Sequence, residues 1–130
     1  MLFRAAERSQ RVIVDTLGTT TTGHPFVMLT ITSPENHARL AELQDIQMKL
    51  ADPRMISSES ELNQLFDDGK AVAMITHGIH STEVGPSQMA ARLAYTMALP
   101  NAERILEIME NAISLQIPSL NPDVLQWVND

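Results

Sequence analysis

The chain has 130 residues, 44% of them hydrophobic and 19% charged, a composition that fits a single domain over residues 1–130 and argues against disorder. Its net charge of −7 disfavours a nucleic-acid partner, and the lack of cysteine excludes disulfides and thiolate metal ligands. No stretch approaches the about 20 apolar residues of a membrane span, so we expect no membrane partner either.

The first predicted element is a short helix over residues 2–9. Its charged residues do not fit the apolar core of a signal peptide. The segment reads instead as a helix already in progress, so we expect the natural start to lie upstream. By default this predicts a cytoplasmic location.

A β-hairpin is predicted next. Residues 11–17 alternate between charged and apolar side chains and are rich in valine, and residues 26–32 form a second apolar run. A threonine-rich turn over residues 18–23 separates the two runs. The two strands therefore pair as neighbours.

Two helices are predicted between the hairpin and the next strand. The first begins at Ser33, an N-cap residue followed by Pro34 in the first helical position. Its apolar residues recur every three or four positions until Asp52 and Pro53 end it. The second helix covers residues 58–69 and closes at a glycine.

The carboxy-terminal half predicts a strand–helix–strand unit. Residues 71–76 are uninterruptedly apolar, the pattern of a strand covered on both faces. Helices over 86–99 and 102–110 follow, and residues 113–120 form another buried strand. Such units are parallel and right-handed. The predicted fold class is α/β, a mixed sheet with an amino-terminal β-hairpin and a parallel βαβ unit, with helices packed on the sheet.

Candidate ligands follow both strands of this unit. His80 and Glu83 come after the first strand, and residues 121–123 come after the second. Ligands of open α/β sheets bind outside the carboxyl ends of the parallel strands, so both segments belong to one rim. Imidazole and carboxylate together suit zinc. Alone, the pair also fits a turn histidine beside an acid at a helix N-terminus.

Three segments resemble the zinc carboxypeptidases of the carboxypeptidase A type. The letters Gly-Ile-His-Ser-x-Glu over residues 78–83 are similar to the zinc-binding segment of that family. Residues 115–123, ending in Asn-Pro-Asp, resemble its following strand and turn, and residues 11–26 resemble its opening hairpin. The resemblance covers nearly the whole chain but only the amino-terminal part of the family's catalytic domain, which implies an incomplete zinc-exopeptidase-like domain.

The resemblance implies a zinc-dependent metallocarboxypeptidase that hydrolyses carboxy-terminal bonds of peptide or protein substrates. His80 and Glu83 take the positions of two metal ligands, with one Zn²⁺ per complete site. The third ligand, the arginines that hold the substrate carboxylate and the glutamate base have no counterpart in the sequence. We therefore expect no catalytic residue within these 130 residues and no turnover by the chain alone.

Some neighbouring residues depart from the pattern or add to it. His77 would extend it to His-x-x-His-x-x-Glu, but it points away from His80 if the strand continues to residue 78. Asn121 and Asp123 either support the ligands or cap the local turn. Val124 replaces the family's turn glycine, so we expect a reshaped turn. Thr82 replaces an arginine common in digestive members.

Two other functions remain open at this point. One is a zinc deacylase of the aspartoacylase or succinylglutamate desuccinylase type, although those usually carry His-Gly-Asn-Glu. The other is a non-catalytic fragment or interaction module with a vestigial metal site. Because the later strands of the family are missing, residues 71–76 should also offer an unpaired edge through which the chain self-associates.

Overall fold

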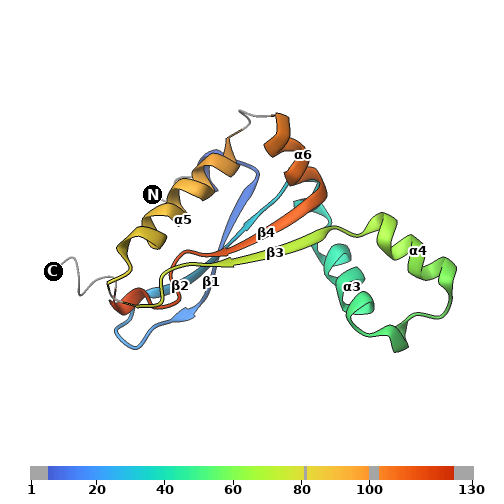
Figure 1. The fold of residues 1–130 in the computed structure, drawn as a ribbon, viewed down its shortest axis with the longest axis horizontal. Coiled ribbons are helices and arrows are strands. Elements are labelled where there is room, and N and C mark those ends of the chain that lie inside the picture. The colour runs from blue at the N-terminus through green and yellow to red at the C-terminus, as the bar shows by residue number, and fades with distance from the viewer. Residues whose placement is uncertain (1–5, 81, 100–102, 125–130) are drawn as a thin grey trace.

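The computed structural model describes residues 6–80, 82–99 and 103–124 (Figure 1). Its centre is a four-stranded sheet in the order β1-β2-β4-β3. The strands are β1 (Val12–Thr19), β2 (Pro25–Ile31), β3 (Ala71–Thr76) and β4 (Ala112–Ile117). β1 and β2 form an antiparallel hairpin, β2 and β4 pair antiparallel, and β3 and β4 pair parallel. The predicted mixed sheet, hairpin and βαβ unit are all confirmed.

Helices pack on both faces of the sheet. α5 (Val84–Ala98) packs on β2 and β4, and α6 (Glu103–Asn111) leads into β4. α3 (Leu40–Ala51) and α4 (Glu59–Asp68) pack together at one end of the opposite face (Figure 1). The remaining helical elements are α2 (Pro34–Ala38) and the 3₁₀ turn η1 (Pro53–Met55). No helix in the described part of the chain is long and apolar enough to cross a bilayer.

Each covered face has its own apolar core. Under α5 and α6, the buried core joins the hairpin to the helices through Val12, Leu29, Ile31, Ala94, Ala98 and Met109. The alanines let α5 approach the sheet closely. Under α3, a smaller core consists of Leu43, Ile46, Leu65 and Ile113.

The helix predicted from Ser33 to Asp52 is two helices. Ser33 caps α2 as expected, because its side chain accepts the N–H of Asn36. The chain then leaves helical geometry at Arg39, with φ −120° and ψ 24°. His37 Nε2 lies 2.9 Å from the Arg11 carbonyl, which ties α2 to the start of β1 while α3 turns towards its own core. Tertiary contacts therefore divide a segment that local spacing reads as continuous.

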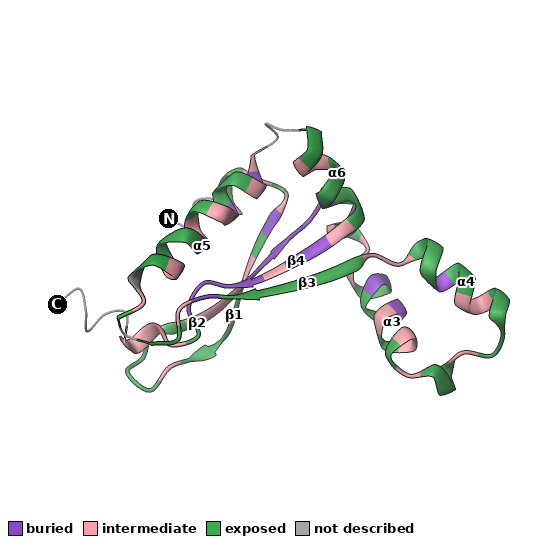
Figure 2. Cartoon of the chain, viewed as in Figure 1, coloured by how far each residue is buried: buried purple, intermediate pink, exposed green. Residues whose placement is uncertain are grey.

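β3 lies at an edge of the sheet formed by the described residues, as expected for residues 71–76, but its burial differs from the prediction. Its apolar sequence indicated a strand covered on both faces, yet all six residues are exposed (Figure 2). β3 is exposed because it lies at the edge of the sheet. On one face of the sheet, α5 packs on β2 and β4, and on the other face α3 covers only one end. β4 is buried as predicted, since it lies between β2 and β3.

A buried polar node joins the end of β2 to the start of β4. The Asn36 amide donates to Thr32 Oγ1 at 3.0 Å and to the Met109 and Glu110 carbonyls at 3.1 Å each. Thr32 Oγ1 lies 3.0 Å from the Met109 carbonyl and 2.8 Å from the Ala112 carbonyl, and its one hydrogen is donated to either of them. Asn36 and Thr32 are both buried. The node supplies donors to carbonyls at the α6 carboxyl end, where the Met109 carbonyl also accepts the N–H of Ser33 at 3.0 Å.

Replacing Asn36 by Ala should therefore lower the free energy of unfolding by about 1–3 kcal/mol, because the Glu110 carbonyl loses its side-chain donor and the Met109 carbonyl loses one of its donors. Urea unfolding measures the change. Asn63→Ala is the matched control, since Asn63 is exposed on α4, and it should shift stability by less than about 0.5 kcal/mol. Equal effects of the two substitutions would contradict a structural role for the node.

Candidate metal centre

The two parallel strands end at the same rim, and their following loops are bonded to each other. The N–H of His77 donates to the Ile117 carbonyl at 3.0 Å and so extends the ladder by one residue. The N–H of Leu120 then reaches the His77 and Gly78 carbonyls at 2.9 and 3.0 Å. Ser119 Oγ also donates to the Gly78 carbonyl, at 3.3 Å. The loop after β4 therefore positions the segment that leads to His80.

His80 and Glu83 face each other at this rim. His80 Nδ1 lies 2.8 Å from Glu83 Oε1, and the N–H groups of Ile79 and His80 both donate to Glu83 Oε2 at 3.2 Å. The N–H of Glu83 closes the turn by donating to the His80 carbonyl at 3.1 Å. The His80 side chain is 73% exposed, so an ion can reach the pair from solvent.

These contacts stabilise the charged form of Glu83. The hydrogen bond from His80 contributes most, followed by the N–H groups of His80 and Ile79, and together they lower the pKa of the Glu83 carboxyl. The interactions stabilise the fold fully above the ordinary glutamate pKa of about 4.3. This contribution is lost as the pH falls through the lowered pKa.

Gly78 is required by the bend between β3 and His80, a role that motif spacing did not reveal. Its φ is +43°, a left-handed conformation that side chains disfavour. A Cβ at this position would also lie 2.5 Å from Ser87 Oγ on α5. Both facts explain why residue 78 is a glycine. In the sequence, the only sign of this bend is a single glycine just after the strand.

His77 does not join the pair. Its side chain is buried, and its Nε2 has no hydrogen-bond partner. Burial lowers the pKa of its imidazole, which favours the neutral form. Among the described residues, no three His, Cys, Asp or Glu side chains converge as a metal site. The structure thus groups His80 with Glu83 and leaves His77 apart.

Asp123 has a tertiary role that the sequence did not reveal. Its carboxylate accepts the hydroxyl of Thr22 at 2.6 Å and the N–H of Thr22 at 3.3 Å, which ties the β1–β2 turn to the rim. Hydrogen bonds from Thr20 and Thr22 lower the pKa of Asp123. The N–H of Asn121 donates to Ser119 Oγ at 3.2 Å, so Asn121 belongs to the local loop.

Val124, which stands where the family's turn has a glycine, lies in a short helical segment. Residues 122–124 are helical. No non-glycine residue in the described ranges has a positive φ, so Val124 carries no left-handed strain. The loop contacts of Ser119 and Leu120 with the Gly78 carbonyl come before this segment.

The donor set of His80 and Glu83 fits part of a Zn²⁺ site. One imidazole nitrogen and one carboxylate oxygen already face each other at 2.8 Å. Two ligands of a tetrahedral zinc lie about 3.3 Å apart, so the pair needs to open by only a few tenths of an ångström. A bound cation would replace the proton between them. A catalytic zinc normally has three protein ligands, and the described residues offer two.

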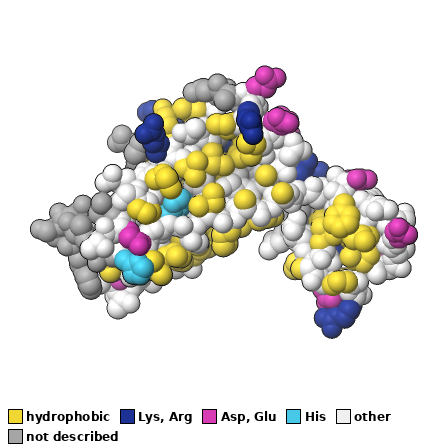
Figure 3. All heavy atoms as spheres, viewed as in Figure 1, with side chains coloured by type: hydrophobic (Ala, Val, Ile, Leu, Met, Phe, Trp, Pro, Cys, Tyr) yellow, Lys and Arg dark blue, Asp and Glu magenta, His cyan; other side chains and the backbone are white. Residues whose placement is uncertain are grey.

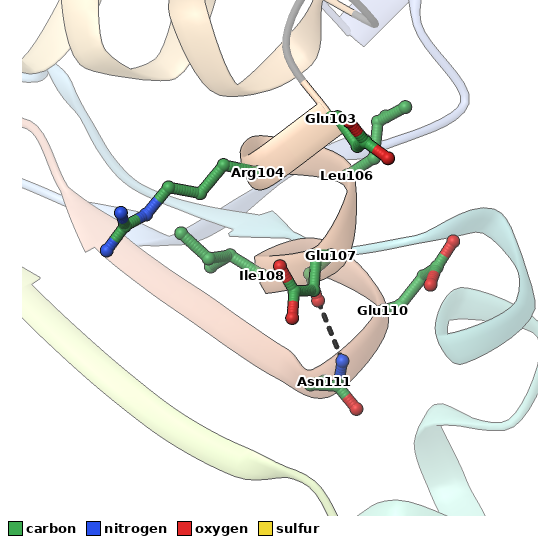
Figure 4. A pocket seen from close by; sticks show the side chains of 7 residues that line it. All are labelled: Glu103, Arg104, Leu106, Glu107, Ile108, Glu110 and Asn111. Atoms are coloured by element: carbon green, nitrogen blue, oxygen red, sulfur yellow. Dashed lines mark hydrogen bonds between the residues drawn. The ribbon is translucent and has the colours of Figure 1, made fainter.

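A separate hollow of about 920 Å³ lies along α6 and is unrelated to this rim (Figure 4). Its lining residues all come from α6. Asn111 in this lining donates to the Glu107 carbonyl at 2.9 Å. Since α6 precedes β4 and His80 lies beyond the opposite end of β3, the hollow is at the other end of the sheet.

Comparison of the chain with known protein families and solved structures identifies its class. A family model described as zinc carboxypeptidase matches residues 2–128, and the chain belongs to this family. No curated protein matches the sequence. The fold agrees with thrombin activatable fibrinolysis inhibitor (TM-score 0.65, 12% identity over 97% of this chain) and with a metallo-carboxypeptidase from Burkholderia cenocepacia (0.61, 16%, 95%). This chain spans 24% and 25% of those two chains, about a quarter of their length.

Removing the imidazole should raise the pKa of Glu83. In an NMR titration of the side-chain carboxyl carbons, Glu83 should titrate below the ordinary value of about 4.3, and His80→Ala should move its midpoint upward. Glu61 is the internal control, because its pKa is lowered by the Ser57 N–H and Lys49 and should not respond. A Glu83 midpoint that ignores His80→Ala would show that the two side chains do not meet in solution.

Proposed function

We propose that this chain forms the zinc-binding rim of a metallocarboxypeptidase, with His80 and Glu83 as two of its metal ligands. The observation that carries the proposal is the 2.8 Å approach of His80 Nδ1 to Glu83 Oε1 just beyond the carboxyl end of β3. Membership of the zinc carboxypeptidase family supports the assignment. The substrate class is a peptide or protein with a free carboxy-terminal residue.

Zinc bound at such a site supplies a Lewis acid that polarises the scissile carbonyl and lowers the pKa of a bound water towards about 7. The residues of this chain would hold and orient the metal. The amides of Ile79 and His80 hold Glu83 Oε2, which leaves Oε1 directed at His80. The loop after β4 supports the bend at Gly78 through Ser119 and Leu120.

Zinc titration of metal-free protein by calorimetry tests the ligand assignment. His80→Ala and Glu83→Ala should each weaken zinc binding by at least about tenfold. Losing a residue that only hydrogen-bonds a metal ligand already weakens metal binding by about tenfold or more. Glu107→Ala is the control, because Glu107 is exposed on α6 at the other end of the sheet. Parent-like affinity in both rim variants would place the metal elsewhere.

The 130-residue chain alone should release no carboxy-terminal residue from peptides. Its described residues provide two metal donors, and the general base and the clamp for the substrate carboxylate are expected in a longer polypeptide. A chromatographic peptide-cleavage assay with and without a chelator measures this. Chelator-sensitive release that disappears in Glu83→Ala would mean that this chain holds a complete site.

A further inference from the structure

Asp123 holds the turn between β1 and β2 with both oxygens of its carboxylate. The Thr22 hydroxyl donates to Oδ1 at 2.6 Å, and the Thr22 N–H donates to Oδ2 at 3.3 Å. A hydroxyl–carboxylate distance of this length is typical of a charge-assisted hydrogen bond, which is about twice as strong as a neutral one. We call this contact the Thr22–Asp123 tether.

The turn that carries Thr22 is held by hydrogen bonds of its own. The Thr20 N–H donates to the His24 carbonyl at 2.8 Å, and the Gly23 N–H donates to the Thr20 carbonyl at 3.1 Å. Thr20 Oγ1 also accepts the His24 N–H at 3.0 Å. Gly23 has a φ of +93°, which glycine adopts without strain. The tether therefore attaches Asp123 to a fixed point of the hairpin.

The loop after β4 connects Asp123 to the bend that precedes His80. Asp123 follows Leu120 by three residues, and the Leu120 N–H donates to the His77 and Gly78 carbonyls at 2.9 and 3.0 Å. On the face drawn in Figure 3, histidine and acidic side chains lie together where β3 and α5 meet, at the end of this series of contacts. The loop is therefore held by β4 at its start and by the tether at its end.

The two oxygens of Asp123 distinguish it from a metal ligand. Each oxygen already accepts a hydrogen bond from Thr22. Among the described residues, no group of three His, Cys, Asp or Glu side chains converges as a metal site, so Asp123 does not join His80 and Glu83. The arrangement indicates that Asp123 holds the loop.

We propose that Asp123 is a positioning residue for the zinc ligands. Through Thr22 it holds the end of the loop after β4, the loop holds the bend at Gly78, and the bend directs His80 towards Glu83. This inference rests on the proposed function, because it takes the pair as the zinc ligands.

Amide exchange of metal-free protein tests the first step. Thr22→Val removes the hydroxyl and keeps the shape of the side chain. It frees the far end of the loop, so the Leu120 amide should exchange about two- to tenfold faster, the effect of losing one ordinary hydrogen bond. Thr22→Ser keeps the hydroxyl, and the Leu120 amide should then exchange as in the parent.

Two controls show whether the effect is local. Thr21→Val is the matched variant, since Thr21 is exposed on the same turn, and it should leave the Leu120 amide unchanged. The Ser33 amide donates to the Met109 carbonyl at the other end of the sheet, and it should not respond to Thr22→Val.

Zinc titration by calorimetry tests the second step. Thr22→Val and Asp123→Ala should each weaken zinc binding about two- to tenfold, because the ligands are less well pre-organised. Thr22→Ser should bind zinc as the parent does. The double variant should bind zinc no more weakly than either single variant, because both changes break the same contact.

Four results would overturn the proposal. A Leu120 amide that does not respond to Thr22→Val would show that the tether does not hold the loop. Equal acceleration of the Leu120 and Ser33 amides would show a general loss of stability. Faster Leu120 exchange with unchanged zinc affinity would show that the loop does not position the ligands. Weaker zinc binding in Asp123→Ala but not in Thr22→Val would make Asp123 a ligand.

Failure of the proposed function is recognised separately. Parent-like zinc affinity in His80→Ala and Glu83→Ala would overturn that function, and with it the role of the tether in zinc binding. The Leu120 amide is measured without metal, so it tests the tether by itself.

Discussion

Parallel pairing of β3 with β4 is the constraint on which the rim depends. The register from Ala71 opposite Ala112 to Thr76 opposite Ile117 brings both strands to their ends together. Beyond it, the bonds from Leu120 to the His77 and Gly78 carbonyls continue the attachment into the loops. A slip of one residue would turn His77 outward and move the bend at Gly78 away from Ser87. The position of His80 is therefore a consequence of sheet register.

Local sequence patterns predicted most helices and strands correctly, because the residues that start and end these elements lie close together in the sequence. Ser33 and Ser58 cap helices through N–H groups three residues later, as expected of N-cap serines. The break at Arg39 was not predicted, because α2 is held by distant segments, through His37 at the Arg11 carbonyl and Asn36 at residues more than 70 positions away. The apolar pattern of residues 71–76 wrongly indicated a strand covered on both faces, although the edge position expected for the same residues is observed. Apolar sequence shows what a strand can bury, but not which elements cover it.

In the candidate site too, the contacts between residues close in sequence were predicted and the long-range contacts were not. His80 and Glu83 are three residues apart, so their spacing alone indicated that their side chains could meet, and they do. The tether between Thr22 and Asp123 spans 101 residues and left no local signal. Asp123 read as a turn residue because an Asn-Pro-Asp segment usually caps its own backbone. Its partner in the structure is Thr22, which the fold brings beside the rim from the β1–β2 turn.

The short separation between His80 and Glu83 also limits how strongly a metal can stabilise the fold. Both donors remain neighbours when the chain unfolds, so at the proposed site the unfolded segment would keep some affinity for zinc. Stabilisation by a ligand depends on the difference between its binding to the native and unfolded states. What the native rim adds is order, through the two amides that hold Glu83 and the loop that holds Gly78. At the proposed zinc site, folding and metal loading would therefore be only loosely coupled.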